Sequence, residues 1–196
     1  MIDPHKHGLQ PYGCGCVLFK DPAVGRLYKH DSPYTYFTSK ELHLGEISLE
    51  CSRAGAAAVA LWATQRLLPL TPGGAFAQGL GSGRKAALEL DKRLRQDGRC
   101  ETLAGGPELD IVAWKLAAAD AEQASALAQR TFVACATRDL HLALVQLPQF
   151  WFQASAPGAG ELVICLRSVL MKPEHAAWLG RIWERYTAAC SEVVGE

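Results

Sequence analysis

The second half of the chain alternates between two patterns of apolar and polar residues, one typical of helices and one typical of strands. Apolar residues spaced three or four positions apart predict helices, whereas short, mostly apolar runs bounded by turn residues predict strands. In chain order, these patterns predict a helix over 75–95, a strand over 109–116, a helix opening at Asp120 and running over 120–132, strands over 141–148 and 161–171, and a helix over 172–190. This α-β-α-β-β-α order is typical of a compact two-layer α+β unit.

The first third of the chain has a looser pattern. Residues 13–19, "GCGCVLF", form a short apolar run that ends at a turn and predict a buried strand. Residues 21–48 are interrupted by prolines and glycines, which indicates a long loop, and loops of that length are usually functional or disordered. Small residues over 52–68 predict a helix that approaches another element closely. The glycines of residues 79–83 do not match a phosphate-binding loop, because no strand precedes them.

Composition narrows the class of protein. The 196 residues are 49% hydrophobic, enough for a core, and carry 20 basic and 20 acidic residues, so no strong field attracts nucleic acid or an anionic membrane. The seven cysteines form no CxxC pair and no signal peptide precedes them, which favours reduced thiols in the cytoplasm. The partner is expected to be a small molecule or a protein.

Lys6 lies between His5 and His7, close to the first residue. A lysine becomes a nucleophile or forms a Schiff base only when its amine is neutral, which requires desolvation or neighbouring positive charge. Alternatively, the segment is a solvated terminus. A metal site would combine the two histidines with Cys14 and Cys16, but nothing in the sequence completes its ligand set.

Three segments carry a resemblance to a known family. Residues 3–21, "DPHKHGLQPYGCGCVLFKD", resemble the lysine segment of the group II pyridoxal-phosphate-dependent amino-acid decarboxylases, which include the aromatic-amino-acid, tyrosine and glutamate enzymes. Residues 51–67, "CSRAGAAAVALWATQRL", and 166–175, "LRSVLMKPEH", resemble later segments in the same order. The resemblance implies the α/β aspartate-aminotransferase-like fold, fold type I, with residues 1–72 as the end of the large domain and 73–196 as the small α+β carboxyl-terminal domain.

The resemblance also implies roles for the residues around the lysine. Lys6 would form the Schiff base with pyridoxal 5'-phosphate, and His5 would lie beside the cofactor, although a packing role for this histidine is equally compatible with the sequence. Asp3 matches a position that approaches the cofactor phosphate. A carboxylate repels a phosphate dianion, so such a contact would have to use the backbone or water.

Other implied site residues lie further along the chain. Arg167 matches an arginine that faces the substrate carboxylate, and its planar guanidinium suits bidentate binding. Tyr34 and Tyr36 lie where the family has a mobile lid with a proton-donating tyrosine, but the sequence does not distinguish the two, and both are also suited to a dimer contact. Arg53 matches a family position that is interpreted first as structural.

The expected function is therefore that of the carboxyl-terminal part of a pyridoxal-phosphate-dependent amino-acid decarboxylase, acting on a small amino acid within a homodimer. The family has further site residues before its lysine, and these are expected to come from a missing amino-terminal half. A start codon placed too late or a protein split into two chains would explain why Lys6, Arg167 and the loop tyrosines are retained. Two alternatives stay open. One is an aminotransferase or carbon–carbon lyase of the same fold, and the other is a non-catalytic interaction module.

Overall fold

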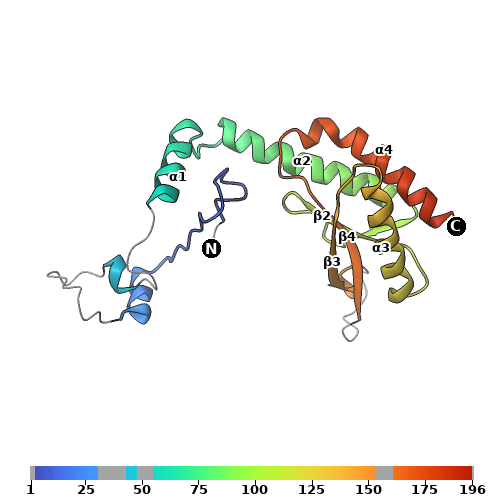
Figure 1. The fold of residues 1–196 in the computed structure, drawn as a ribbon, viewed down its shortest axis with the longest axis horizontal. Helices are drawn as coiled ribbons and strands as arrows, with labels where there is room; N and C mark the ends of the chain where they lie inside the picture. The colour runs from blue at the N-terminus through green and yellow to red at the C-terminus, as the bar shows by residue number, and fades with distance from the viewer. Residues whose placement is uncertain (1–2, 31–42, 48–54, 153–160, 196) are drawn as a thin grey trace. The chain divides into compact units, whose positions relative to one another are not determined.

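The computed structural model describes residues 3–30, 43–47, 55–152 and 161–195 (Figure 1). The chain divides into two compact units, Met1–Leu70 and Thr71–Glu196, here called unit 1 and unit 2. The assignment of the two parts to a large and a small domain stays a prediction. Among the described residues, no helix is both long and apolar enough to cross a membrane.

Unit 2 is built on an antiparallel sheet of β1 (Cys100–Thr102), β2 (Ile111–Leu116), β3 (Ala143–Pro148) and β4 (Leu162–Val169). The strand order is β1-β2-β4-β3, so β4 is paired on both sides and β1 is a short edge strand. In the register, Leu166 of β4 lies opposite both Trp114 of β2 and Leu144 of β3.

Three helices pack with this sheet: α2 (Ala75–Gln96), α3 (Ala121–Ala136) and α4 (His175–Val194). α4 contacts both α2 and α3, and α3 also contacts β4 (Figure 1). The side chain of Asp120 accepts a hydrogen bond of 2.8 Å from the backbone N–H of Gln123, which is how an N-cap satisfies an otherwise unpaired helical donor.

The core of unit 2 lies between the sheet and the helices. Trp114, Leu116 and Leu166 point to this side because alternate residues of a strand share a face, and each is at most 1% exposed. They pack with buried alanines and leucines of α2 and with Tyr186 of α4. The two-layer α+β architecture predicted from the pattern is therefore confirmed.

The element predictions for unit 2 differ from the structure at two places. β1 lies within residues 96–108, which the pattern left without an element, because a three-residue strand is too short to show a period. The pattern predicts the last helix over 172–190, but α4 begins at His175 and leaves Pro173 before its start. Residues 172–174 form a turn instead.

Unit 1 contains one regular α-helix, α1 (Ala56–Leu67), among its described residues. This helix confirms the prediction over 52–68, although each of its residues is at least partly exposed. Two 3-10 helices, η1 (Pro22–Tyr28) and η2 (Leu44–Glu46), lie within the segment predicted as a loop. They are joined by a 2.8 Å hydrogen bond from the His30 backbone N–H to the Glu46 carbonyl and by an ion pair of 3.0 Å between Lys29 and Glu46.

The strand predicted over 13–19 is wrong. Of these residues, all of which are described, only Cys16 forms an isolated bridge, and Val17, Leu18 and Phe19 are more than half exposed. A strand is stable only with hydrogen-bonded neighbours, and the described part of unit 1 supplies no sheet for this segment to join. Apolar composition alone therefore did not determine the local structure.

Gly83 allows α2 to approach the end of β4. A Cβ atom at this position would lie 2.6 Å from the carbonyl oxygen of Leu170, so Gly83→Ala forces the two elements apart. We expect it to lower the free energy of unfolding by about 1–3 kcal/mol, measured by urea denaturation. Gly81→Ala is the matched control, because its Cβ would meet nothing within 4 Å. It should raise stability by about 0.5–1 kcal/mol, and a rise in both variants would contradict the close approach.

Candidate functional site

Lys6 lies in a tight turn near the start of unit 1. The Lys6 N–H donates to the carbonyl of Asp3 at 2.9 Å, and the N–H of Gln10 donates to the carbonyl of Pro4 at 3.0 Å. A Cβ at Gly8 would lie 2.7 Å from backbone atoms of Pro4, so the turn can close this tightly only with glycine there. The motif "DPHKHG" is therefore a compact structural unit that presents the lysine side chain outward.

The Lys6 ammonium pairs with the carboxylate of Asp3. The Nζ–Oδ2 distance is 2.7 Å, and the lysine side chain is 60% exposed. The hydrogen bond from Lys6 lowers the pKa of Asp3 below its ordinary value. An amine attacks a carbonyl only in its neutral form, so this ion pair has to open and the ammonium has to lose a proton before Lys6 reacts.

His5 is held on the other side of the turn. Its Nδ1 lies 3.3 Å from the carbonyl oxygen of Cys14, and its ring centroid lies 5.3 Å from that of Tyr12. Because a carbonyl only accepts, Nδ1 must carry the proton in this contact, which leaves Nε2 as the acceptor of the neutral ring. The packed ring has a defined orientation, while Lys6 beside it is exposed.

The turn is held against α1 by residues that follow the lysine. The side-chain amide of Gln10 donates to Thr64 Oγ1 at 2.7 Å, and the thiol of Cys14 lies 3.8 Å from the carbonyl of Ala57. Gln10 and Cys14 are both buried. These contacts anchor the middle and the last residue of the "HGLQPYGC" segment, which directly follows the lysine.

These residues fit part of what pyridoxal phosphate requires. The exposed Lys6 amine is accessible for a covalent attachment, and the oriented His5 ring lies next to it in the chain. The Asp3 carboxylate is charged and engaged by Lys6, so its predicted approach to the cofactor phosphate would use the backbone or water. The turn therefore suits the cofactor's covalent attachment, and Asp3 is the counter-ion of the lysine in this structure.

Arg167 lies on the central strand of unit 2, directly opposite Ala113 on β2 and Ala143 on β3. The two small neighbours leave room beside a large side chain. Its Nε atom is buried and has no hydrogen-bond partner among the residues that the structure describes. A buried, unpaired donor is costly unless something binds it, so this guanidinium is a candidate for holding an anion.

A cavity of about 240 Å³ lies at this end of the sheet. Arg167 and Ser168 line it together with His141 and His175. The two histidines come from the segment before β3 and from the start of α4, so only the tertiary structure brings them to Arg167. No spacing in the sequence indicated either of them.

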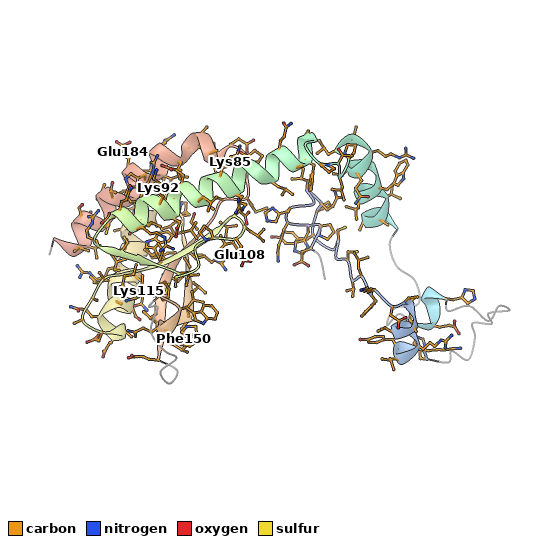
Figure 2. All side chains as sticks on the ribbon, turned by 180° about the vertical axis from the view of Figure 1, so that it is seen from behind. Lys85, Lys92, Glu108, Lys115, Phe150 and Glu184 are labelled. Carbon is orange, nitrogen blue, oxygen red and sulfur yellow. The ribbon has the colours of Figure 1, made fainter. Side chains whose placement is uncertain are left out.

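Lys115 is a second unusual lysine. Its side chain is only 4% exposed, and its Nζ lies 2.9 Å from Glu101 Oε1 on the neighbouring strand. Figure 2 labels it on the sheet, apart from Lys85 and Lys92 on α2. Because this ammonium is both covered and paired, Lys115 is a structural residue, and Lys6 is the accessible lysine of the two.

Not all predicted site residues are brought together. Tyr34, Tyr36 and Arg53 lie outside the described residues. Lys6 belongs to unit 1 and Arg167 to unit 2, and each is described within its own unit. The structure therefore describes the surroundings of Lys6 and of Arg167 separately, and the roles of these residues stay predictions.

The chain is similar in sequence to curated amino-acid decarboxylases. It is 36% identical over 97 residues to the L-tyrosine decarboxylase of Enterococcus faecium and 34% identical over 119 residues to a probable L-tyrosine/L-aspartate decarboxylase of Methanothermobacter thermautotrophicus. These matches cover 48% and 58% of the chain but only 16% and 28% of the two relatives. No protein-family model matches the chain.

Solved structures define the fold. A rice TDC crystal structure with PLP and tryptamine superposes with a TM-score of 0.62 at 15% identity, covering 86% of this chain and 33% of that one. The sphingosine-1-phosphate lyase of Burkholderia pseudomallei gives 0.63 at 16% identity, covering 98% and 36%. The fold is therefore that of part of a fold type I pyridoxal-phosphate enzyme. Within this class, the sequence matches confirm the predicted resemblance to the group II amino-acid decarboxylases over the matched residues.

Replacement of Lys6 by methionine tests the ion pair in the turn. We expect the pKa of Asp3 to rise toward its ordinary value in Lys6→Met, because the hydrogen bond that lowers it is lost. A lowered carboxyl pKa contributes stability above the ordinary pKa of aspartate, and this contribution is lost as the pH falls through the lowered value. An NMR titration of the Asp3 carboxyl measures the change. Lys20→Met is the control, and an equal shift in both variants would contradict a specific pair.

Replacement of Arg167 by methionine tests whether this arginine stabilises the fold. Because its buried Nε is unpaired in the described structure, Arg167→Met should change the free energy of unfolding by less than about 1 kcal/mol or raise it. Arg99→Met is the control, because Arg99 pairs with Asp97 at 2.7 Å and donates to Ser191 at 2.9 Å. It should lower stability by about 1–3 kcal/mol in guanidinium denaturation. A larger loss in Arg167→Met than in the control would identify Arg167 as structural.

Proposed function

We propose that this chain is the carboxyl-terminal part of a pyridoxal-phosphate-dependent amino-acid decarboxylase, with Lys6 as the residue that forms the Schiff base with the cofactor. The observation that carries the proposal is the "DPHKHG" turn, which presents an exposed lysine at a motif that resembles the family's lysine segment. The sequence relatives, both named as decarboxylases, support the same reaction.

Asp3 and His5 have different roles at the amine of Lys6. When bound, pyridoxal phosphate withdraws the electrons left behind as the bond to the substrate carboxylate breaks. Asp3 holds the Lys6 ammonium until the proton leaves, and His5, oriented by the carbonyl of Cys14, is the residue that would contact the cofactor. Asp3 reaches the cofactor phosphate only through the backbone or water.

Arg167 binds the carboxylate of the amino-acid substrate. The unpaired buried Nε supports this role, because an incoming carboxylate satisfies a donor that the described protein leaves open. Tyr34 or Tyr36 returns a proton to the substrate carbon after carbon dioxide has left. This last role comes from the resemblance of the loop to the family's lid.

The chain needs further residues to complete the site. It spans 16% and 28% of the two decarboxylase relatives, so we propose that the other cofactor contacts come from an additional polypeptide segment, within a homodimeric or two-chain assembly. The six cysteines among the described residues are free thiols, which supports a reducing compartment such as the cytoplasm. The role in amino-acid metabolism rests on the decarboxylase relatives.

A different reaction on the same fold is the second candidate. The lyase from Burkholderia pseudomallei resembles this chain in fold as closely as rice TDC does, so the fold itself is compatible with carbon–carbon cleavage and with transamination. A non-catalytic role as an interaction module is the third candidate, and it is compatible with the separate core of unit 2. Product analysis separates these alternatives.

The test of the cofactor role is reductive trapping. The full chain is incubated with pyridoxal phosphate, reduced with borohydride and digested, and the modified lysines are identified by mass spectrometry. Lys6 should be modified in preference to other lysines, because it is exposed in an ordered turn. Lys6→Ala should remove this adduct and the near-visible absorption that accompanies it, whereas Lys20→Ala should retain both.

Two results separate cofactor attachment from the reaction. Equal labelling of all exposed lysines would contradict the proposed attachment at Lys6. Carbon dioxide release from a panel of L-tyrosine, L-aspartate and L-glutamate, measured for the chain assembled with the remaining segments of the enzyme, tests decarboxylation. Formation of a keto acid or an aldehyde without release of carbon dioxide would contradict decarboxylation and favour transamination or carbon–carbon cleavage.

A further inference from the structure

Two buried cysteines lie between the edge strand and the last helix of unit 2. Cys100 begins β1, and Cys190 lies in the last turns of α4. They are 8% and 0% exposed. The Sγ atom of Cys100 lies 3.0 Å from the hydroxyl of Tyr186, which also accepts a hydrogen bond of 3.0 Å from Trp114 Nε1.

Contacts on both sides align β1 with α4. Arg99 donates to Ser191 Oγ at 2.9 Å, and Cys100 contacts Tyr186. Residues four apart on a helix share a face, so Cys190 lies one turn beyond Tyr186 on the side that faces β1. Cys100 and Cys190 therefore lie on the same side of Tyr186 between β1 and α4, and both belong to one buried core cluster.

The surroundings make the two thiols different. The hydrogen bond with Cys100, together with the charge of Arg99, lowers the pKa of Cys190 below its ordinary value. The same hydrogen bond and burial raise the pKa of Cys100. Cys135 on α3 is also buried, and burial raises its pKa to about 12. One sulfur of the pair is therefore the nucleophile and the other keeps the proton, while Cys135 is the inert neighbour.

We propose that Cys100 and Cys190 form a redox-active dithiol, which a low-molecular-weight disulfide converts into a disulfide that ties β1 to α4. The Cys190 thiolate attacks one sulfur of the oxidant, whose sulfur–sulfur bond breaks and releases one thiolate. The sulfur of Cys100 then loses its proton and attacks the sulfur of Cys190 in the mixed disulfide, releasing the second thiol. The two cysteines lose two electrons together, and the oxidant gains them.

Access to the buried pair requires a local opening. β1 has only three residues and pairs on one side alone, with β2, so it is the least supported strand of the sheet. Segments with so few contacts open at a lower free energy than the core. The reaction uses neither Lys6 nor pyridoxal phosphate, so this dithiol is independent of the proposed decarboxylase function.

The test is disulfide mapping of the full chain. The reduced protein is titrated with oxidised glutathione, free thiols are blocked with iodoacetamide, and a digest without reductant is analysed by mass spectrometry. We expect a cross-linked peptide containing Cys100 and Cys190, and a melting temperature higher by about 5 °C or more, because the cross-link restricts the unfolded chain. Added dithiothreitol should reverse both changes.

Matched variants separate this pair from its neighbours. Cys135→Ala should retain the cross-link and the shift in melting temperature, whereas Cys100→Ala and Cys190→Ala should lose both. Circular dichroism checks that each variant is folded. If a variant is unfolded, the disulfide map of the unaltered chain decides whether Cys100 and Cys190 form the cross-link. A cross-link that involves Cys135, or glutathione adducts confined to Cys14, Cys16 and Cys51, would overturn the proposal.

Discussion

The pairing of β4 on both of its edges is the constraint on which unit 2 depends. It places Leu166 against Trp114 in the core and turns Arg167 to the opposite face, between two alanines. A shift of one residue would exchange these faces, bury the arginine among the helices and expose the leucine. Core packing and the orientation of the candidate substrate-binding residue are therefore set by the same backbone hydrogen bonds.

The lysine turn depends on local interactions instead. Backbone hydrogen bonds within residues 3–10 and the close contact between Gly8 and Pro4 shape it, and the contacts of Gln10 and Cys14 with α1 add long-range support. Such a turn holds its shape without a sheet beneath it. This explains why the lysine segment is compact although the strand predicted after it does not form.

The helices and longer strands of unit 2 could be predicted because each has a clear period and end signals, as with Asp120 at the start of α3. β1 was missed because three residues carry no period. Lys6 and Arg167 could be predicted as candidate site residues through their motifs, since each lies within a run of neighbours that resembles the family. His141 and His175 could not, because nothing in the sequence gives either histidine a role, although His175 ends the run that contains Arg167, and each reaches the cavity only through folding.

The sequence by itself determined the order of elements, the two-layer class of unit 2, the neutral overall charge and the motif that contains Lys6, because these depend on local pattern and composition. Tertiary structure alone decided that the buried Nε of Arg167 has no partner among the described residues and that Cys100 faces Tyr186. Those facts depend on contacts of individual atoms. Charge pairing and burial arise only where folding brings particular side chains together and excludes water from them.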